Sequence, residues 1–452
     1  MFNRHSLGSV SIALLLFAVP PAWSADPAFK FFRWDEDYRA LSGVQDLSFY
    51  DRLKFTELTD SMYLSFGGGI RERLNYYQND LFGLTTNNDG NLLLSRLLVH
   101  GDLHLNENAR LFVELGGHYT REDGIAPGPF DEDEVDVTQA FVDLSASNTT
   151  VRLGRQEMSL GSTRLVGVRD GPNVRRAFDG VRIDSSWKAV DLRLFALQEV
   201  RVLDGSWDNE SNAGEELWGA YGSLESSISR FDIYYLGLNR DAASYAQGRA
   251  DETRHSFGVR AYGQRGAWDW DYEAIYQGGS FGDADIRAWT AATVTGFSLD
   301  ELPWKPRLAL SANIASGDDD LEDGTLGTFN PLYPNLMYFE EAAILAPQNF
   351  TNLEPEITVY PSDRLSISFD WDFFWRLERE DAVYVRGLRP LTGTQGTSER
   401  FVTHVPSLSI DYEINRYLAV NLSYSRFFAG DVIDDAGGTD IDFLKLEAQL
   451  TF

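Results

Sequence analysis

The sequence predicts an all-β fold, a transmembrane antiparallel β-barrel of about 18 strands with both termini on the periplasmic side. Three observations lead to this fold class. Residues 443–452 alternate strictly between apolar and polar positions and end on Phe452. Similar alternating segments recur along the whole chain. The connections between these segments are short and long in turn.

The closing segment carries two different faces. Leu444, Leu446, Ala448, Leu450 and Phe452 share one face, and Lys445, Glu447, Gln449 and Thr451 share the other. Successive side chains of a strand point to opposite sides, so one side of this strand is apolar and the other polar. Such a strand fits a membrane barrel with lipid outside and water inside. The final Phe also resembles the closing strand of bacterial outer-membrane proteins.

Seventeen further segments alternate in the same way, and helical periodicity is scarce. They are centred on residues 64–76, 92–105, 110–120, 135–144, 150–156, 180–187, 189–197, 216–224, 229–238, 256–263, 268–277, 285–295, 307–315, 353–360, 365–377, 403–414 and 417–427. Together with the closing segment they give the predicted strand count.

The rhythm of the connections supports a barrel over a soluble β-sandwich. Short connections include 106–108, 145–149, 185–188, 225–227, 264–266, 361–363 and 415–416. Long connections include 78–90, 121–134, 157–179, 200–215, 316–352 and 378–400. Outer-membrane barrels have short periplasmic turns and long extracellular loops, whereas a sandwich has no reason to keep this order.

The N-terminal region predicts a secretory signal peptide at residues 1–24. Arg4 precedes an apolar run at 11–19, and Ala22 and Ser24 form a small-x-small cleavage site. The apolar run is too short for a membrane span, which needs roughly 20 residues. Residues 25–60 do not alternate, and we interpret them as a periplasmic N-terminal segment or as a plug that enters the lumen. Residues 61–452 form the predicted barrel.

Composition narrows the possible functions. The chain has 39 basic and 69 acidic residues, a net charge of −30, so nucleic-acid binding is not expected. It contains no cysteine, which excludes disulfides, thiolate chemistry and lipoprotein acylation. Aromatic residues make up 13% of the chain, which suits the aromatic girdles of a membrane barrel.

Strand parity predicts which charged residues face the lumen. The inward set includes Arg71, Arg73, Arg96, Asp143, Arg152, Arg182, Arg193, Arg260 and Arg376. Inward arginines offer weak sites in series that pass carboxylated solutes. The alternative is that they pair with carboxylates across strands and stiffen the wall. Glu72 departs from the pattern because parity places it on the lipid side, and we expect a bulge at residues 67–69.

Catalytic and metal chemistry are not expected, and the sequence indicates no cofactor. His100 and His104 would lie roughly 13 Å apart along a strand, too far to share one metal ion. A hairpin folded about Glu107 instead places Glu114 near His100 and Arg96 near His118. An acidic run with Asp318, Asp319, Asp320 and Asp323 is a weak Ca²⁺ candidate, and a solvated loop is the simpler interpretation.

Several motifs resemble the alginate-export family of outer-membrane barrels. They are Phe141-Val142-Asp143, the strand end 151–156 with Gly154-Arg155-Gln156, the loop stretches 164–167 and 175–181, and the stretch 33–38. The resemblance implies an 18-stranded monomeric barrel whose electropositive constriction passes a polyuronate. The residues that match the family motif, Arg152, Arg155 and Asp143, are by this resemblance expected to be site residues. Parity points Arg155 outward, and a bulge at Gly154 is needed to turn it into the lumen.

The sequence therefore predicts a channel of the bacterial outer membrane for passive passage of an anionic polysaccharide, an alginate-like polyuronate, or a related carboxylated solute. Two alternatives remain: a general or small-carboxylate porin, and a surface receptor or adhesin barrel without transport specificity. An outer-membrane enzyme has the least support. The expected partners are outer-membrane lipid and lipopolysaccharide, the anionic saccharide, and periplasmic export partners.

Overall fold

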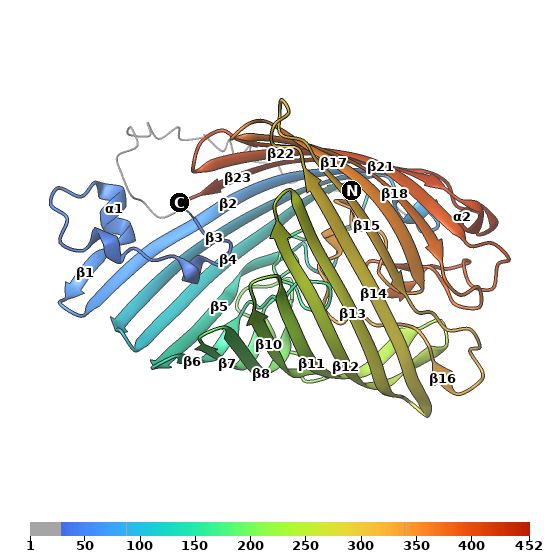
Figure 1. The fold of residues 1–452 in the computed structure, drawn as a ribbon, viewed down its shortest axis with the longest axis horizontal. Helices are drawn as coiled ribbons and strands as arrows, with labels where there is room; N and C mark the ends of the chain where they lie inside the picture. Colours follow the sequence, from blue (N-terminus) through green and yellow to red (C-terminus); the bar gives the residue numbers. More distant parts are fainter. Residues whose placement is uncertain (1–28, 87, 339) are drawn as a thin grey trace, which may run out of the picture.

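The barrel is a single closed sheet of 18 antiparallel strands (Figure 1). The computed structural model describes residues 29–86, 88–338 and 340–452, so the predicted signal peptide lies outside the described residues. Among the described residues no helix is long and apolar enough to cross a membrane. Each of the 18 predicted segments corresponds to one barrel strand, and this confirms the predicted fold class.

The barrel strands are β2 (Met62–Gln78), β3 (Gly90–Asn106), β4 (Ala109–Asp123), β5 (Asp133–Ala146), β6 (Thr149–Gln156), β7 (Phe178–Trp187), β8 (Val190–Arg201), β10 (Glu215–Glu225), β11 (Arg230–Tyr245), β12 (Gly248–Arg265), β13 (Trp268–Phe281), β14 (Ala284–Ser298), β15 (Arg307–Ala315), β17 (Phe350–Ser362), β18 (Leu365–Arg376), β21 (Phe401–Glu413), β22 (Leu418–Ala429) and β23 (Ile441–Thr451). The other elements are η1 (Arg33–Asp35), η2 (Arg39–Leu41), α1 (Phe49–Lys54), β1 (Thr56–Thr59), η3 (Asp80–Gly83), β9 (Glu210–Ser211), β16 (Thr325–Leu326), η4 (Leu336–Tyr338), β19 (Tyr384–Val385), β20 (Arg389–Pro390) and α2 (Asp431–Asp435).

The C-terminal strand closes the barrel against the first barrel strand. β23 pairs with β2 from Gly69 opposite Thr451 to Gln78 opposite Asp442. The pairing continues to the last residue, because Gly68 and Phe452 exchange backbone hydrogen bonds of 2.8 and 3.0 Å. Closure leaves the barrel without a free strand edge, which a membrane protein requires because lipid offers no hydrogen bonds.

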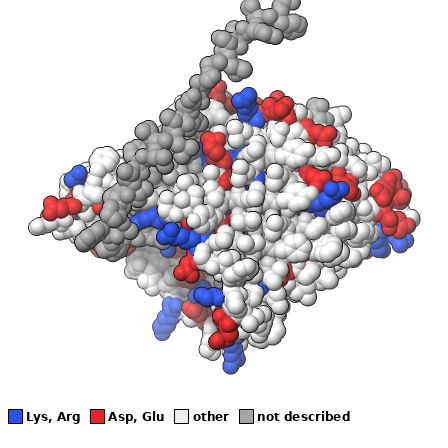
Figure 2. All heavy atoms as spheres, turned by 90° about the horizontal axis from the view of Figure 1, so that it is seen from above, with Lys and Arg blue, Asp and Glu red and all other residues white. Residues whose placement is uncertain are grey.

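The two faces of the wall differ as the alternation predicts. Leu446 is 52% exposed on the outer face, whereas its neighbour Lys445 is 3% exposed on the inner face. Aromatic residues are exposed near both ends of the strands, with Trp187, Trp268 and Trp304 near one end and Tyr119, Tyr276 and Trp289 near the other. Figure 2 shows wide uncharged areas on one face of the molecule, with Lys, Arg, Asp and Glu scattered around them.

Short and long connections lie at opposite ends of the barrel. We call the end with the turns at residues 107–108, 147–148 and 363–364 the turn rim, and the opposite end the loop rim. Two loop-rim connections are short, at 246–247 and 282–283, because the hairpins β11–β12 and β13–β14 extend farther than predicted. One turn-rim connection, 299–306, is longer than the others.

Both ends of the barrel wall lie at the turn rim, where β2 begins and β23 ends. In Figure 1, α1, β1 and the C-terminus lie toward one end, and α2 and β16 lie toward the other. The assignment of the turn rim to the periplasm stays a prediction.

Long loops fold back into the barrel and form the main hydrophobic core there. Val166 of the β6–β7 loop is fully buried and forms a β-bridge with Tyr333 of the β15–β17 loop. Tyr333 packs edge-on against Phe178 of the inner wall, with ring centroids 5.4 Å apart. Burying these side chains stabilises the infolded loops through the hydrophobic effect. The lumen near the loop rim is therefore not the open, water-filled space that alternation alone suggests.

The bulge expected beneath Glu72 is absent. The pairings of β2 with β3 and with β23 run without a register shift across residues 67–69. Glu72 stays on the outer face and accepts a hydrogen bond of 2.6 Å from the Ser95 hydroxyl of the adjacent strand. A neighbouring hydroxyl, and not a change of register, therefore solvates this carboxylate.

The outer face predicts how the barrel responds to an added charge. Replacing Leu446 with Arg places a cation in the lipid at the middle of β23, and we expect it to lower the unfolding free energy in lipid vesicles by about 2–4 kcal/mol. The control Gln449→Arg places the same side chain on the inner face of the same strand. Urea unfolding measures both variants, and equal losses would contradict the assignment of the two faces.

Candidate functional site: the arginine-rich inner wall

Arginines concentrate on the inner face of β2 through β8. This basic sector contains Arg71, Arg73, Arg96, Arg110, Arg152, Arg182 and Arg193. All but Arg110 belong to the predicted inward set. These guanidiniums fall into two groups by their partners. One group binds the backbone of an infolded loop, and the other forms ion pairs with carboxylates of the wall.

The first group holds the β6–β7 loop, residues 157–177, inside the barrel. Arg73 donates a hydrogen bond of 2.7 Å to the backbone carbonyl of Gly171, and Arg96 donates one of 2.7 Å to that of Asn173. Arg71 donates to the carbonyls of Asp170 and Pro172. These arginines are 2–5% exposed. A charged donor stabilises a buried carbonyl that has no secondary-structure partner.

A carboxylate of the same loop lies among three guanidiniums. Asp170 is 2.6 Å from Arg96, 3.5 Å from Arg175 and 4.0 Å from Arg71, and its side chain is 36% exposed. Burial raises the pKa of Asp170, but the three guanidiniums outweigh burial and hold this pKa well below its ordinary value. Asp170 is therefore an anion at neutral pH and occupies a cluster of three arginines on the inside of the barrel.

Arginines elsewhere on the wall hold the other infolded loops in the same manner. Arg376 is 1% exposed, and it donates to the backbone carbonyls of Arg379, Thr394 and Glu399 in the β18–β21 loop. Arg254 is fully buried and donates to the Thr328 carbonyl of the β15–β17 loop at 3.3 Å. Arg376 was predicted as a constriction residue, and the structure places it beneath a loop.

The second group forms alternating ion pairs near the turn rim. Arg152 binds both carboxylate oxygens of Asp143, at 2.7 and 2.8 Å, and Arg110 lies 3.9 Å from the same carboxylate. Asp184 accepts hydrogen bonds from both Arg182 and Arg193. Of the predicted arginines in this group, Arg152 and Arg182 are buried, whereas the Arg193 side chain is 33% exposed.

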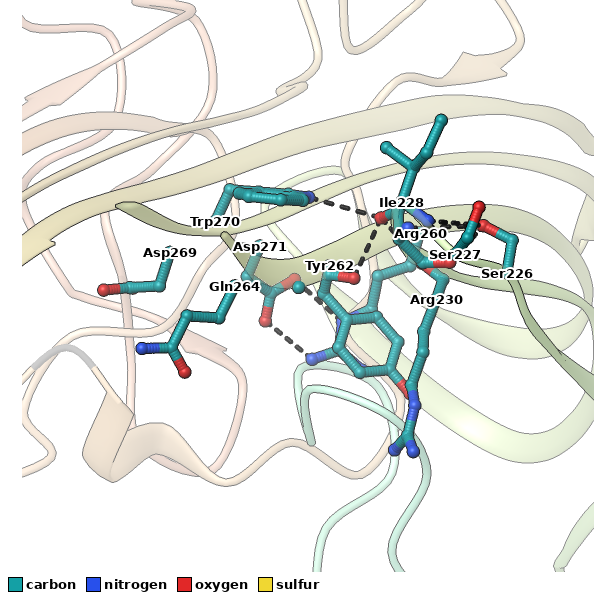
Figure 3. A pocket seen from close by; sticks show the side chains of 12 residues that line it. Ser226, Ser227, Ile228, Arg230, Arg260, Tyr262, Gln264, Asp269, Trp270 and Asp271 are labelled. Carbon is teal, nitrogen blue, oxygen red and sulfur yellow. Dashed lines mark hydrogen bonds and ion pairs between the residues drawn. The ribbon is translucent and has the colours of Figure 1, made fainter. Parts of the chain in front are cut away.

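Arg260 lines a pocket of about 600 Å³ at the turn rim, between the β10–β11 and β12–β13 turns (Figure 3). Its guanidinium donates to both oxygens of Asp271, at 2.8 and 2.7 Å, and to Asp232 at 3.2 Å. The Tyr262 ring lies against the guanidinium, 4.0 Å from its carbon. Two carboxylates thus balance the charge of Arg260, and the other arginine of the pocket, Arg230, pairs with Glu225 at 3.1 Å.

Arg155 does not face the lumen. The pairings of β6 with β5 and with β7 contain no register shift at Gly154, so Arg155 shares the outer face with Leu153. It donates to both oxygens of Asp179, at 2.9 and 3.1 Å. The bulge that was needed to turn Arg155 inward is absent, and the structure gives this residue a place outside the lumen.

The acidic run of the β15–β17 loop is not arranged as a metal site. Asp318 and Asp320 accept hydrogen bonds from backbone amides two residues ahead, and Asp323 accepts one from Thr325. In the described ranges no group of three His, Cys, Asp or Glu side chains is placed to hold an ion. The weak Ca²⁺ candidate, which also includes Asp319 of this loop, therefore has no geometric support.

The predicted cross-strand neighbours of two histidines do occur. Arg96 pairs with His118, and His100 pairs with Glu114.

Sequence reasoning missed Arg110, Asp170, Arg175 and Arg254. Arg110 shares the face of Glu114 on β4 and begins the predicted segment 110–120, so parity extended from Glu114 to the start of that segment would have found it. Arg254 lies in the part of β12 that the prediction left out. Asp170 and Arg175 belong to a loop without periodicity, and nothing in their spacing indicates that the loop enters the barrel.

Comparison with known proteins identifies the type of barrel. A family model described as alginate export matches residues 62–446. Among solved Pseudomonas aeruginosa porins, OpdQ is 14% identical over 87% of this chain and 99% of its own, with a TM-score of 0.59. OpdK with vanillate is 11% identical over 87% and 98%, with a TM-score of 0.58. OccK2 (OpdF) in complex with glucuronate is 10% identical over 86% and 98%, with a TM-score of 0.55. No curated protein matches the chain.

The loop contacts of Arg376 predict a specific defect when it is replaced. In Arg376→Met the carbonyls of residues 379, 394 and 399 lose a charged donor. Each lost hydrogen bond lowers the stability of the docked loop by about 1.5 kcal/mol or more. We expect subtilisin to cleave residues 377–400 at least about tenfold faster than in the wild type. The control Arg389→Met alters an exposed guanidinium of the same loop. Equal cleavage of both variants would show that Arg376 does not hold the loop.

Buried carboxyls in the loops predict a pH dependence of loop docking. Asp318 is 1% exposed, and burial together with Asp381 raises its pKa to about 7. A carboxyl whose pKa is raised by folding stabilises the folded loop fully below its ordinary pKa, and this stabilisation is lost as pH rises through about 7. Amide hydrogen exchange in residues 316–330, corrected for intrinsic rates, is expected to show more opening at pH about 8 than at pH about 5.

The variant Asp318→Asn removes the titrating group and keeps the side-chain size, so the difference between the two pH values is expected to shrink by about tenfold or more. Asp319→Asn, at the next position of the same loop, is the matched control. An unchanged pH dependence in Asp318→Asn would rule out Asp318 as its source.

Proposed function

The chain belongs to the alginate-export family and is a channel of the bacterial outer membrane, and from this premise we propose that its solute is an anionic saccharide of the polyuronate class or a related carboxylated solute. The family match spans most of the chain, and the solved barrels of the same fold are channels and not enzymes. The direction of transport depends on partners outside the barrel.

The observation that carries this proposal is the clustering of guanidiniums in and beside the basic sector. Arg71, Arg73, Arg96 and Arg175 meet the carboxylates of Asp170, Glu341 and Glu447 at 2.6–4.0 Å. Arg175 also contacts Glu157 at 3.1 Å, and burial raises the pKa of this carboxyl to about 8. Guanidiniums bind carboxylates well because their fork of donors matches both oxygens.

The opposite wall has a different character. The inner faces of β17 and β18 carry Glu354, Glu356, Asp370 and Asp372. Within the described ranges only Arg307 forms an ion pair with this set, at 3.5 Å from Glu356. The two walls therefore offer a solute different partners, guanidiniums on β2–β8 for its carboxylates and carboxyl groups on β17 and β18 for its hydroxyls.

Arg193 is the predicted arginine with the best access to a solute. A third of its side chain is exposed, and its described partners are Asp184 and the backbone carbonyl of Ser159. Arg71, Arg73, Arg96 and Arg376 act on the solute mainly through the shape of the loops that they hold. Their direct contact with a solute stays a prediction.

A small-carboxylate porin is the second candidate. The infolded loops bury most inward arginines, which narrows the space for a polymer. OpdK was solved with vanillate and OccK2 with glucuronate, and the carboxylate that these solutes share suits the basic sector.

Outer-membrane lipid and lipopolysaccharide surround the barrel, whereas the monomeric state and periplasmic export partners stay predictions.

Planar-bilayer recordings test the proposal. We expect the wild type to prefer chloride over potassium and to be blocked by a polyuronate. Arg193→Glu, which changes the lumen charge by two units, is expected to lower this preference about fivefold. The control Arg287→Glu makes the same change at a side chain that is 67% exposed on the outer face.

Cation preference in the wild type, or no block by any uronate, would contradict the proposal. Block by glucuronate without block by a polyuronate would support the small-carboxylate porin over the polymer channel.

A further inference from the structure

The N-terminal segment enters the barrel at the turn rim. Trp34 is 5% exposed and packs edge-on against Phe112 of β4 and Phe141 of β5, with ring centroids 5.9 and 5.5 Å apart. Both phenylalanines belong to the inner wall and are almost fully buried. The indole therefore lies inside the mouth of the lumen and not beneath it.

Trp34 covers two guanidiniums of the basic sector. The Arg152 guanidinium carbon lies 3.6 Å from the centroid of the Phe141 ring and 4.8 Å from that of the Trp34 ring. Arg110 donates a hydrogen bond of 2.7 Å to the Trp34 carbonyl. One Arg152 nitrogen, Nη1, is buried without a hydrogen-bond partner. A guanidinium between two aromatic rings with a free donor is a site for a planar acceptor such as a carboxylate.

Trp34 thus covers the Arg152 guanidinium, while the next residue, Asp35, is exposed to water.

Polar contacts fasten the start of the segment to the seam of the barrel. Arg33 donates to the carbonyls of Gly68 and Phe452, at 2.8 and 3.0 Å, on the two strands that close the barrel. Glu36 holds the Arg33 guanidinium at 2.7 Å. Phe31 and Phe49 of the segment remain 56% and 72% exposed. Tyr38, Lys54 and Phe55 are buried elsewhere in the segment, so the part at the arginine cluster can open locally while the rest of the segment stays attached.

We propose that residues 29–60 act as a stopper, in which Trp34 covers a uronate-binding position formed by Arg110 and Arg152 at the turn rim. The proposal rests on the proposed function and adds a ligand position and its regulation. A uronate that arrives from the turn-rim side competes with the segment. Because the site is free only when the segment is displaced, its apparent affinity for uronate is reduced by the fraction of open molecules.

The test uses the full-length barrel in planar bilayers, with glucuronate added to the turn-rim side. Trp34→Ala removes the packing that holds the stopper. We expect a larger unitary conductance than in the wild type and block at about tenfold lower glucuronate concentration. Phe49→Ala is the matched control, since Phe49 belongs to the same segment and is largely exposed. The double variant Trp34→Ala/Arg152→Gln is expected to lose the gain in glucuronate block.

The outcomes separate the stopper from the channel function. If the wild type selects anions and is blocked by uronates, but Trp34→Ala matches it in conductance and block, the stopper is wrong and the function stands. If neither protein selects anions, the proposed function fails. Electrophoretic heat-modifiability checks that each barrel has folded. A gain of block that survives Arg152→Gln would also overturn the assigned position.

Discussion

Buried backbone carbonyls inside the barrel are the constraint on which the inner architecture depends. Three long loops enter the lumen with little secondary structure of their own, so their carbonyls need partners. Arginines of the wall supply these partners: Arg73 and Arg96 for the β6–β7 loop, Arg254 for the β15–β17 loop, and Arg376 for the β18–β21 loop. Because a guanidinium carries five donors and keeps its charge, one side chain can satisfy several carbonyls at once.

The same arginines give the lumen its electrostatic character. Backbone carbonyls accept hydrogen bonds but do not cancel a full charge, so a guanidinium that holds a loop still contributes to the field. Where carboxylates are also present, as at Asp170 and Asp184, they are shared among several arginines. The architecture thus builds a structural support and an anion-attracting wall from one set of residues, with Arg193 as its most accessible member.

The strand pattern was readable from the sequence because each wall residue meets either lipid or the interior. This two-sided environment imposes a period of two, and it was sufficient for all 18 strands, for the closing role of Phe452 and for the inward direction of Arg71, Arg152 and Arg376. It also predicted the cross-strand pairs of His100 with Glu114 and of Arg96 with His118.

The partners of the inward side chains were not readable, because no periodicity governs loops. The sequence gives no sign that Asp170 reaches Arg96, or that residues 394–399 lie over Arg376. Arg155 shows the opposite error, since a motif resemblance outweighed a parity rule that was correct. Solute access depends on how the loops fill the lumen, and strand periodicity carries no information on this.

The central claim is that anions follow the basic sector past the infolded loops. Anomalous diffraction from crystals soaked in sodium bromide and, separately, in rubidium chloride tests it most directly. The account predicts bromide peaks in the lumen beside Arg193 and near the arginines around Asp170, with rubidium confined to the wall of β17 and β18. Rubidium peaks along β2–β8, or a lumen without bromide, would contradict it.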